Sequence, residues 1–138
     1  MPTWSTLLLA ATALHAGFQA TVTVLVYPAL SRVGPADWER EHGAHSRRIV
    51  PLVGVVYGFL AVACLGALLT LPASPGLWVA LLGTLGAVLV TAFGAAPTHA
   101  RLADGPAPAL VGRLLVLDRW RLAGALVALG GALAQALA

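Results

Sequence analysis

The sequence predicts an all-α integral membrane protein, a bundle of four transmembrane helices, and three observations support this fold class. The chain is 59% hydrophobic and only 9% charged, with a mean hydropathy of +0.90. Four of its stretches approach or exceed the roughly 20 apolar residues that a membrane-spanning helix needs. Every charged side chain falls in the two segments 32–48 and 101–121. A composition of this kind is typical of a single membrane domain.

The four predicted spans cover residues 4–30, 49–71, 77–96 and 119–138. The first is longer than the apolar core of a signal peptide and has no Lys or Arg before it, so it is interpreted as a span. Acidic residues closely follow Pro35, as they do at helix N-termini, so the helix of the second span is expected to begin near residue 36. The breaker-rich segment "LPASPG" predicts a short turn between the second and third spans.

The distribution of charge predicts the orientation of the chain. All eight Arg and all five acidic residues lie in or beside the connections between spans 1 and 2 and between spans 3 and 4. With four spans these two connections share one membrane face, which the positive-inside rule places in the cytoplasm, with both termini outside. Because no basic helix or aromatic-basic platform exists outside the spans, the sequence pI near 10 does not indicate a nucleic-acid partner.

Several patterns concern how the spans pack. The stretches "YPALSRVGPA" and "APTHARLADGPA" share a Pro, an Arg four residues later and Gly-Pro-Ala, which indicates duplicated hairpins or merely shared turn chemistry. Small residues four positions apart, such as Gly54 with Gly58 and Gly124 with Ala128, favour close helix contacts and a compact bundle. Cys64 is the only cysteine, which excludes an intrachain disulfide.

The first span carries a stripe of polar residues. His15, Gln19, Thr23 and Tyr27 are each four residues apart and therefore share one helical face. Polar groups inside a bilayer face the bundle or a water-filled cavity. With Tyr27 near the membrane surface, a rise of 1.5 Å per residue places His15 about 18 Å deeper, near the bilayer centre. The stripe is either one wall of a polar pocket or a set of hydrogen bonds between helices.

A second group of ionisable residues precedes the second span, in the stretch "WEREHGAHSRR". Trp38, His42, His45 and Ile49 lie on one helical face that continues toward the core. Two His at this spacing can converge on one metal ion or one substrate, although two His alone do not make a metal site. The alternative interpretation is a pair of solvated His side chains.

The ends of the third and fourth spans return to the same membrane face. His99 follows Pro97, and Asp118 and Arg121 are three residues apart, a spacing at which they can pair. The chain after Arg121 barely covers the hydrocarbon core, so this pair is expected at the membrane interface. It is either part of a site or a structural ion pair that also contacts lipid phosphates.

These motifs together resemble a known group. The runs "YPAL", "HSRRI", "PTHARLADG" and "LDRWR" are similar to those of small four-span bacterial membrane proteins without assigned activity, over about Tyr27 to Arg121. More distantly, the chain resembles the anthrone-oxygenase-like family of four-helix membrane proteins, which has a Pro-polar-x-x-Leu element after span 3 and a Trp/Arg element in span 4. Where the nearer group carries Asn before the Trp, this chain has Asp118 followed by Arg119.

The resemblance implies a location in the bacterial plasma membrane and a cytoplasm-facing pocket. The residues that it implies for this pocket are Tyr27, His42, His45, Arg48, His99, Asp118, Trp120 and Arg121. The oxygenases of the distant family act on polycyclic phenolic substrates without a bound cofactor. An oxygenase-like reaction on a lipophilic, aromatic substrate is therefore what the resemblance implies.

Two classes of function stay open. As an enzyme, the chain would use His42, His45, His99, Asp118, Arg121 and Tyr27 for catalysis, and His15, Gln19, Thr23, Trp38, Arg48 and Trp120 for substrate binding. Its His residues would act as a general base, or His42, His45 and His99 would bind copper, iron or zinc. The alternative is a non-enzymatic membrane component: a metal- or haem-binding subunit, a small transporter, or a partner in a complex, including a homo-oligomer.

Overall fold

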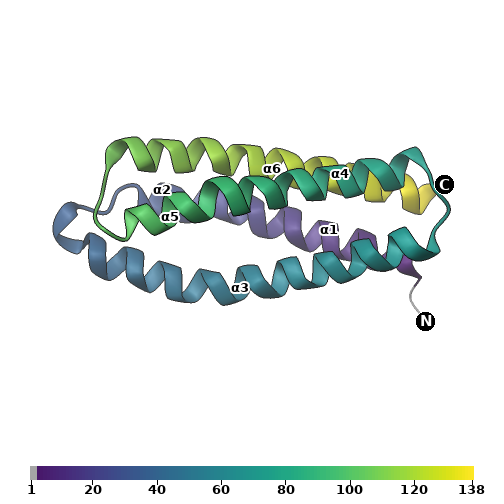
Figure 1. The fold of residues 1–138 in the computed structure, drawn as a ribbon, viewed down its shortest axis with the longest axis horizontal. Helices are drawn as coiled ribbons and strands as arrows, with labels where there is room; N and C mark the ends of the chain where they lie inside the picture. Colours follow the sequence, from purple (N-terminus) through teal and green to yellow (C-terminus); the bar gives the residue numbers. More distant parts are fainter. Residues whose placement is uncertain (1–2) are drawn as a thin grey trace.

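The computed structural model describes residues 3–138, and in that range it contains helices and no strand. Its segments are α1 (Trp4–Thr21), η1 (Val22–Val26), α2 (Tyr27–Leu30), α3 (Pro35–Thr70), α4 (Pro75–Val90), η2 (Thr91–Ala95), α5 (Ala96–Leu102) and α6 (Pro108–Leu137). The first three segments run on as one long helix, and so do α4, η2 and α5. The result is a bundle of four long helices that alternate in direction (Figure 1).

All four long helices are long and apolar enough to cross a membrane, which confirms the predicted all-α architecture with four candidate membrane spans. Their outer faces are apolar: the side chains of Val24, Leu69 and Phe93 are 66%, 75% and 77% exposed. Soluble monomers rarely expose contiguous apolar patches of this kind. Helices satisfy their own backbone hydrogen bonds, and such a surface is therefore suited to contact with lipid.

The helix bounds agree with the predicted spans at the start of the chain and extend them elsewhere. The first helix covers residues 4–30 as predicted, and α3 begins at Pro35, close to the expected position. The third helix runs from Pro75 to Leu102, beyond the predicted 77–96. The fourth begins at Pro108 rather than at Arg119. Its polar residues interrupt the apolar run but not the helix: Asp118 and Arg121 point into the bundle, and Arg113 and Arg119 are exposed on the outer face.

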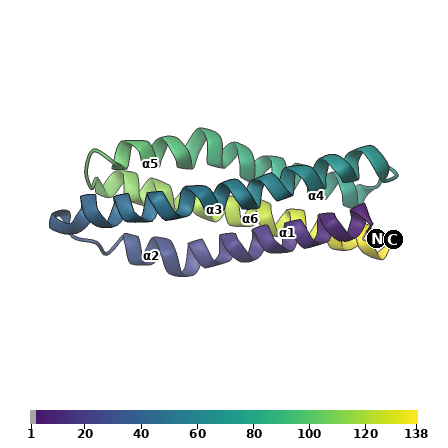
Figure 2. The ribbon, with the colours of Figure 1, turned by 90° about the horizontal axis from the view of Figure 1, so that it is seen from below.

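The start of α1 and the end of α6 lie at one end of the bundle, next to the turn between α3 and α4 (Figure 2). The opposite end carries the two charged connections, residues 31–34 and 103–107. The prediction that both charged connections share one end of the molecule is therefore confirmed. At the other end, Ser74 caps α4 by accepting a hydrogen bond from the Leu77 amide at 3.0 Å, which ends the predicted "LPASPG" turn.

Two π-helical segments interrupt the first and third long helices at matching positions. In η1 the Tyr27 amide donates to the Val22 carbonyl, and the next residue is Pro28. In η2 the Ala96 amide donates to the Thr91 carbonyl, and the next residue is Pro97. Proline lacks an amide donor and clashes with the carbonyl four residues earlier, so each helix widens there. The shared proline of the two repeated motifs therefore has the same structural effect in both helices.

The closest helix contact joins α4 and α6. A Cβ atom placed on Gly83 would lie 2.6 Å from the Ala128 amide nitrogen, and one on Gly124 would lie 3.0 Å from the Gly83 carbonyl. Glycine at these positions lets the two backbones touch, as small residues do in membrane helix pairs. The predicted contact through Gly54 and Gly58 is not formed, because a Cβ on either would meet no atom of the described chain within 4 Å.

Candidate functional site

Polar side chains are concentrated in the interior of the bundle, and we refer to them as the polar core. They come from all four long helices and are His15, Gln19, Tyr27, His42, His99, Asp118 and Arg121. All except His99 are less than 5% exposed. Polar groups inside a membrane protein are costly and usually functional or paired, so the partners of each one decide what it can do.

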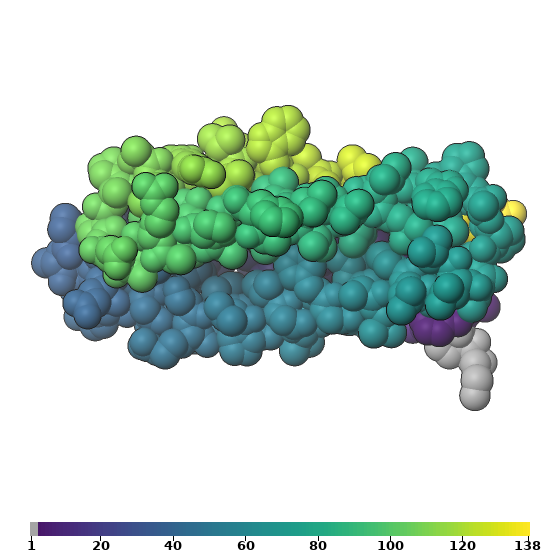
Figure 3. Space-filling model, viewed as in Figure 1, coloured from purple at the N-terminus to yellow at the C-terminus, as the bar shows by residue number. Residues whose placement is uncertain are grey.

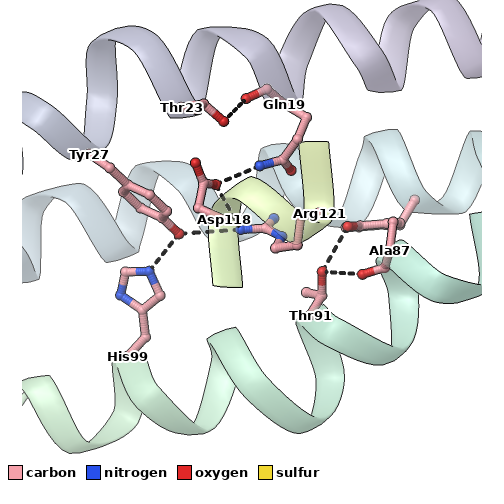
Figure 4. Close-up of polar contacts among 9 residues, drawn as sticks. Gln19, Thr23, Tyr27, Ala87, Thr91, His99, Asp118 and Arg121 are labelled. Atoms are coloured by element: carbon pink, nitrogen blue, oxygen red, sulfur yellow. Dashed lines mark hydrogen bonds and ion pairs between the residues drawn. The ribbon is translucent and has the colours of Figure 1, made fainter. Parts of the chain in front are cut away.

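Asp118 and Arg121 form the centre of the polar core (Figure 4). The carboxylate oxygen Oδ1 of Asp118 accepts a hydrogen bond from Nε2 of Gln19 at 2.6 Å and lies 3.7 Å from Nη1 of Arg121. The predicted pairing of Asp118 with Arg121 is thus present. Because α6 begins at Pro108 and not near Arg119, both residues lie well inside the helix rather than at its start, and Asp118 contacts Gln19 of α1.

A chain of hydrogen bonds leads from Arg121 toward the charged end of the bundle. Nη1 of Arg121 donates to the Tyr27 hydroxyl at 3.3 Å, and that hydroxyl lies 2.9 Å from Nε2 of His99 (Figure 4). On the other side of the His99 ring, Nδ1 lies 3.3 Å from Nε2 of His42. Tyrosine and imidazole groups both donate and accept protons, so this chain can move a proton between Tyr27 and His42.

The π-helical segments explain how two of these residues reach the interior. Tyr27 follows directly after η1, and His99 follows η2 by one turn. An inserted residue in a helix rotates everything after it by about 100°, since an α-helix has 3.6 residues per turn. The two segments thereby set the direction in which Tyr27 and His99 point, and π-helical turns are frequent at functional sites for this reason.

The three His predicted as metal ligands come together, but as a stack of rings. The ring centroids of His42 and His45 lie 5.6 and 5.8 Å from that of His99, at interplanar angles of 26° and 28°. Trp38 extends the stack with a centroid distance of 5.2 Å to His42 and donates its indole N–H to the Leu102 carbonyl. Within residues 3–138 no group of three or more His, Cys, Asp or Glu side chains could hold a metal ion, so the predicted metal site has no support.

The polar stripe of the first span faces inward as predicted, with different surroundings for each residue. Gln19 bonds to α6, while the Thr23 hydroxyl donates to the Gln19 carbonyl of its own helix at 2.9 Å. His15 is fully buried against the ring of Tyr57, with centroids 5.1 Å apart. Neither of its ring nitrogens has a hydrogen-bond partner among the described residues. Only part of the stripe therefore connects helices.

Two of the predicted binding residues, Trp120 and Arg48, are exposed and lie apart from the polar core. Trp120 is 65% exposed on the outer face of α6, pointing away from its neighbours Asp118 and Arg121. Arg48 is exposed and, with His45 and Glu41, lines a separate cavity of about 370 Å³ between α2 and α3. A helical residue two positions from Asp118 necessarily faces another direction, which the linear motif "LDRWR" does not reveal.

The polar core borders a cavity of about 310 Å³, which we call the central cavity. Tyr27, His99, Arg121, Thr91 and Ser46 contribute its polar groups, and the rest of its lining is apolar, with Phe18, Val22, Ile49, Val50, Val53, Ala95 and Ala96. Nε of Arg121 is buried and has no hydrogen-bond partner within residues 3–138. The cavity thus combines apolar walls with one cationic group that has donors to spare.

Sequence reasoning missed Tyr57 and Thr91, whose hydroxyl groups lie 2.8 Å apart between α3 and η2. A hydroxyl group inside an apolar span was the one signal that could have indicated Tyr57, because the face of His42, His45 and Ile49 continues to Val56 and not to Tyr57 at about 100° per residue. Thr91 had no comparable signal, because its inward direction depends on η2.

Comparison of the chain with family models, with curated proteins and with solved structures finds no match.

Proposed function

We propose that this protein is a membrane-embedded enzyme that acts, in an oxygenase-like reaction, on a lipophilic molecule with a weakly acidic phenol or enol group. The central cavity is the observation that carries this proposal. Its volume of about 310 Å³ and its mostly apolar lining, with Arg121, Tyr27 and His99 on one wall, suit a small aromatic molecule with one ionisable oxygen. Binding pockets typically combine apolar walls with a few placed polar groups in this way.

The residues of the polar core have distinct roles in this proposal. Arg121 binds the oxygen of the substrate and stabilises the anion that forms when the substrate loses a proton. The Tyr27–His99 pair accepts that proton, and His42 carries it toward the charged end. Asp118, held by Gln19, positions the guanidinium group of Arg121 and balances its charge while the site is empty.

The oxygenase-like step requires dioxygen as co-reactant, and anthrone serves as a test substrate. Deprotonation gives the anthrone anion, whose carbon forms a bond to O₂, and the resulting peroxide regains a proton. Loss of water then breaks the O–O bond and leaves a carbonyl group at that carbon. Overall, anthrone and O₂ give anthraquinone and H₂O; the carbon loses four electrons and dioxygen gains four.

A carrier for the same class of molecule is the second candidate function. The observation that favours it is the pair of π-helical segments, since Val22 of η1 and Thr91 of η2 both line the central cavity. Many transporters bind their substrates beside helices that are interrupted near the middle of the membrane. A carrier would bind the molecule and move it across the membrane without converting it.

The proposed enzyme is tested by measuring O₂ uptake and anthraquinone formation from anthrone with protein purified into lipid nanodiscs. Arg121→Gln is expected to lower kcat/KM by about 100-fold or more, because it removes the cation that stabilises the anion. Arg119→Gln is the matched control, since Arg119 is exposed on the same helix, and it is expected to stay within about twofold of the wild type.

The outcomes separate the two candidate functions. Anthrone or a related phenol that is bound but not converted, and that crosses the membrane of vesicles containing the protein, would favour the carrier. A wild-type protein that neither binds nor converts any lipophilic phenol would contradict both. Equal losses in Arg121→Gln and Arg119→Gln would remove Arg121 from the proposed site.

A further inference from the structure

Helix α3 closes one side of the bundle without continuous packing against its neighbour. It packs against α1 and hardly contacts the helix formed by α4, η2 and α5. Figure 3 shows a hollow along this border, between α3 in blue and the teal to green helix above it. Side-chain hydrogen bonds span the border instead, and they join Trp38 to Leu102, His42 to His99, Tyr57 to Thr91 and Cys64 to Thr84. We call this border the α3 seam.

Two cavities lie along the α3 seam, one on each side of the Tyr57–Thr91 pair. The central cavity lies toward the charged end. The second, which we call the distal cavity, has a volume of about 450 Å³, and its lining is largely aliphatic, with Leu60, Ala61, Leu81, Leu85, Val88 and Ala92. Thr91 lines both cavities, so the hydrogen bond between Tyr57 and Thr91 is the partition between them.

We infer that the two cavities together bind one amphipathic molecule, whose weakly acidic head occupies the central cavity at Arg121 and whose aliphatic tail passes the Tyr57–Thr91 pair into the distal cavity. This inference rests on the proposed function and adds the tail to its substrate class. The side of the bundle that opens along the α3 seam faces lipid, so a molecule of this kind enters from the bilayer and not from water.

The position of the head follows from the hydrogen-bonding capacity of Arg121. A guanidinium group has five N–H donors in a planar fork. Nη1 makes both contacts with Tyr27 and Asp118, and the buried Nε has no partner within residues 3–138. Because Arg121 lines the central cavity, an oxygen anion bound there would accept from guanidinium N–H groups that do not contact Tyr27 or Asp118. A neutral apolar head would leave them unpaired, at a cost in affinity.

The position of the tail follows from the absence of charge in the distal cavity. Its only polar side chains are the hydroxyl groups of Tyr57, Thr84 and Thr91 and the thiol of Cys64, and all four have partners within the helices. Lipid tails are as apolar as leucine, so an aliphatic chain gains little free energy from leaving the bilayer. The fit of the tail to the volume of the distal cavity therefore decides how well it binds.

The test compares two phenols, 1-naphthol without a tail and 4-dodecylphenol with one, bound to protein in nanodiscs of fixed lipid content. Ala61→Phe fills the distal cavity, and Val62→Phe is the matched control, because Val62 is 60% exposed on the outer face of the same helix. Ala61→Phe is expected to raise the Kd of 4-dodecylphenol at least about tenfold, since overfilled interiors are costly. The Kd of 1-naphthol is expected to stay within about twofold in both variants.

A second measurement uses the wild-type protein alone and does not depend on a variant that folds. Cys64 lines the distal cavity and is the only thiol of the chain. Bound 4-dodecylphenol is expected to slow the reaction of Cys64 with N-ethylmaleimide at least fivefold, while 1-naphthol is expected to leave its rate unchanged.

The results distinguish a failure of the inference from a failure of the proposed function. If 1-naphthol binds and Arg121→Gln abolishes its binding, the proposed binding of the head at Arg121 in the central cavity is supported. Equal affinity of Ala61→Phe and Val62→Phe for 4-dodecylphenol, together with an unprotected Cys64, would then contradict only the binding of the tail in the distal cavity. If neither phenol binds the wild type, the proposed function fails first and the tail site fails with it.

Discussion

Arg121 is a cation that is only 3% exposed in the interior of an apolar bundle, and its neighbours explain how it is tolerated. Asp118 supplies the balancing charge, and Gln19 in turn satisfies the carboxylate with a bond of 2.6 Å. A buried ion pair contributes little net stability when complete, but the loss of one partner leaves an uncompensated charge in the interior. The two residues are therefore expected to tolerate joint replacement better than single replacement.

Asp118→Asn is accordingly expected to lower the free energy of unfolding by about 3–5 kcal/mol, because Arg121 stays buried without its counter-charge. Unfolding in mixed detergent micelles measures this change. The double variant Asp118→Leu/Arg121→Met, which removes both charges, is expected to recover most of the loss. Asp104→Asn, an exposed carboxylate near the charged end, is the control. Equal stability of Asp118→Asn and Asp104→Asn would mean that the charge of Asp118 is not needed to balance buried Arg121.

Residue spacing predicted much of the polar core, and the reason is geometric. His15 and Gln19 share a face that any regular helix would produce, and Asp118 and Arg121 are one turn apart, whereas Tyr27 points inward only because η1 precedes it. Spacing did not predict the partners across helices, such as Gln19 with Asp118, because those depend on the rotation of each helix in the bundle. Nor did it show that Trp120 points outward, since a short motif carries no information about direction.

At the scale of helices, the contact between α4 and α6 depends on glycine. Gly83 lies where a Cβ atom would be 2.6 Å from the Ala128 amide nitrogen and 2.8 Å from the Gly124 carbonyl oxygen. Both neighbours are backbone atoms, which cannot rotate away as a side chain can. Gly86, one turn further along the same helix, is exposed and has no described atom within 4 Å of a Cβ in its place.

These surroundings predict opposite effects for the same substitution. Gly83→Ala is expected to lower the free energy of unfolding by about 1–3 kcal/mol, because the two helices must separate to admit one methyl group. Gly86→Ala is expected to raise it by about 0.5–1 kcal/mol, since alanine favours a helix more than glycine does. Unfolding of both variants in the same detergent checks the pair, and two equal shifts would contradict this account of the α4–α6 contact.

The helices themselves were largely predictable, but their contacts were not. Long apolar runs and the Pro and Gly residues between them predicted the number of helices and two of the three connections closely. The start of α6 was misplaced because Asp118 and Arg121 made its first half look like a connection. The spacing of small residues predicted a helix contact at Gly54 and Gly58, where no described atom lies within 4 Å of an added Cβ. It did not single out Gly83, where the closest helix contact is found. In an Ala-rich chain that signal occurs on several faces, and only the folded bundle selects one.

For the whole molecule, the two ends of the bundle differ in charge, and this difference underlies the proposed orientation. One end carries the connections at residues 31–34 and 103–107 with their flanking Arg side chains, and the other carries the uncharged turn between α3 and α4. The positive-inside rule assigns the first end to the cytoplasm. The His42 end of the hydrogen-bonded chain would then exchange protons with the cytoplasm.

Single-cysteine labelling in a Cys64→Ala background tests this orientation. Ala73→Cys, in the exposed turn between α3 and α4, is expected to react with a membrane-impermeant maleimide in intact cells. Ala103→Cys, exposed in the opposite connection, is expected to react only after the cells are permeabilised. The reverse pattern would place the charged end outside and would invert the direction of proton exchange.

The α3 seam gives the bundle two helix borders of unequal packing. On the α4–α6 side, backbones touch over several turns, so any separation breaks many contacts at once. Where α3 borders the helix formed by α4, η2 and α5, separation breaks a few hydrogen bonds that are several turns apart, while α3 keeps its packing against α1. Both cavities lie along this less tightly packed border, so a molecule that occupies them displaces fewer protein contacts there than it would between α4 and α6.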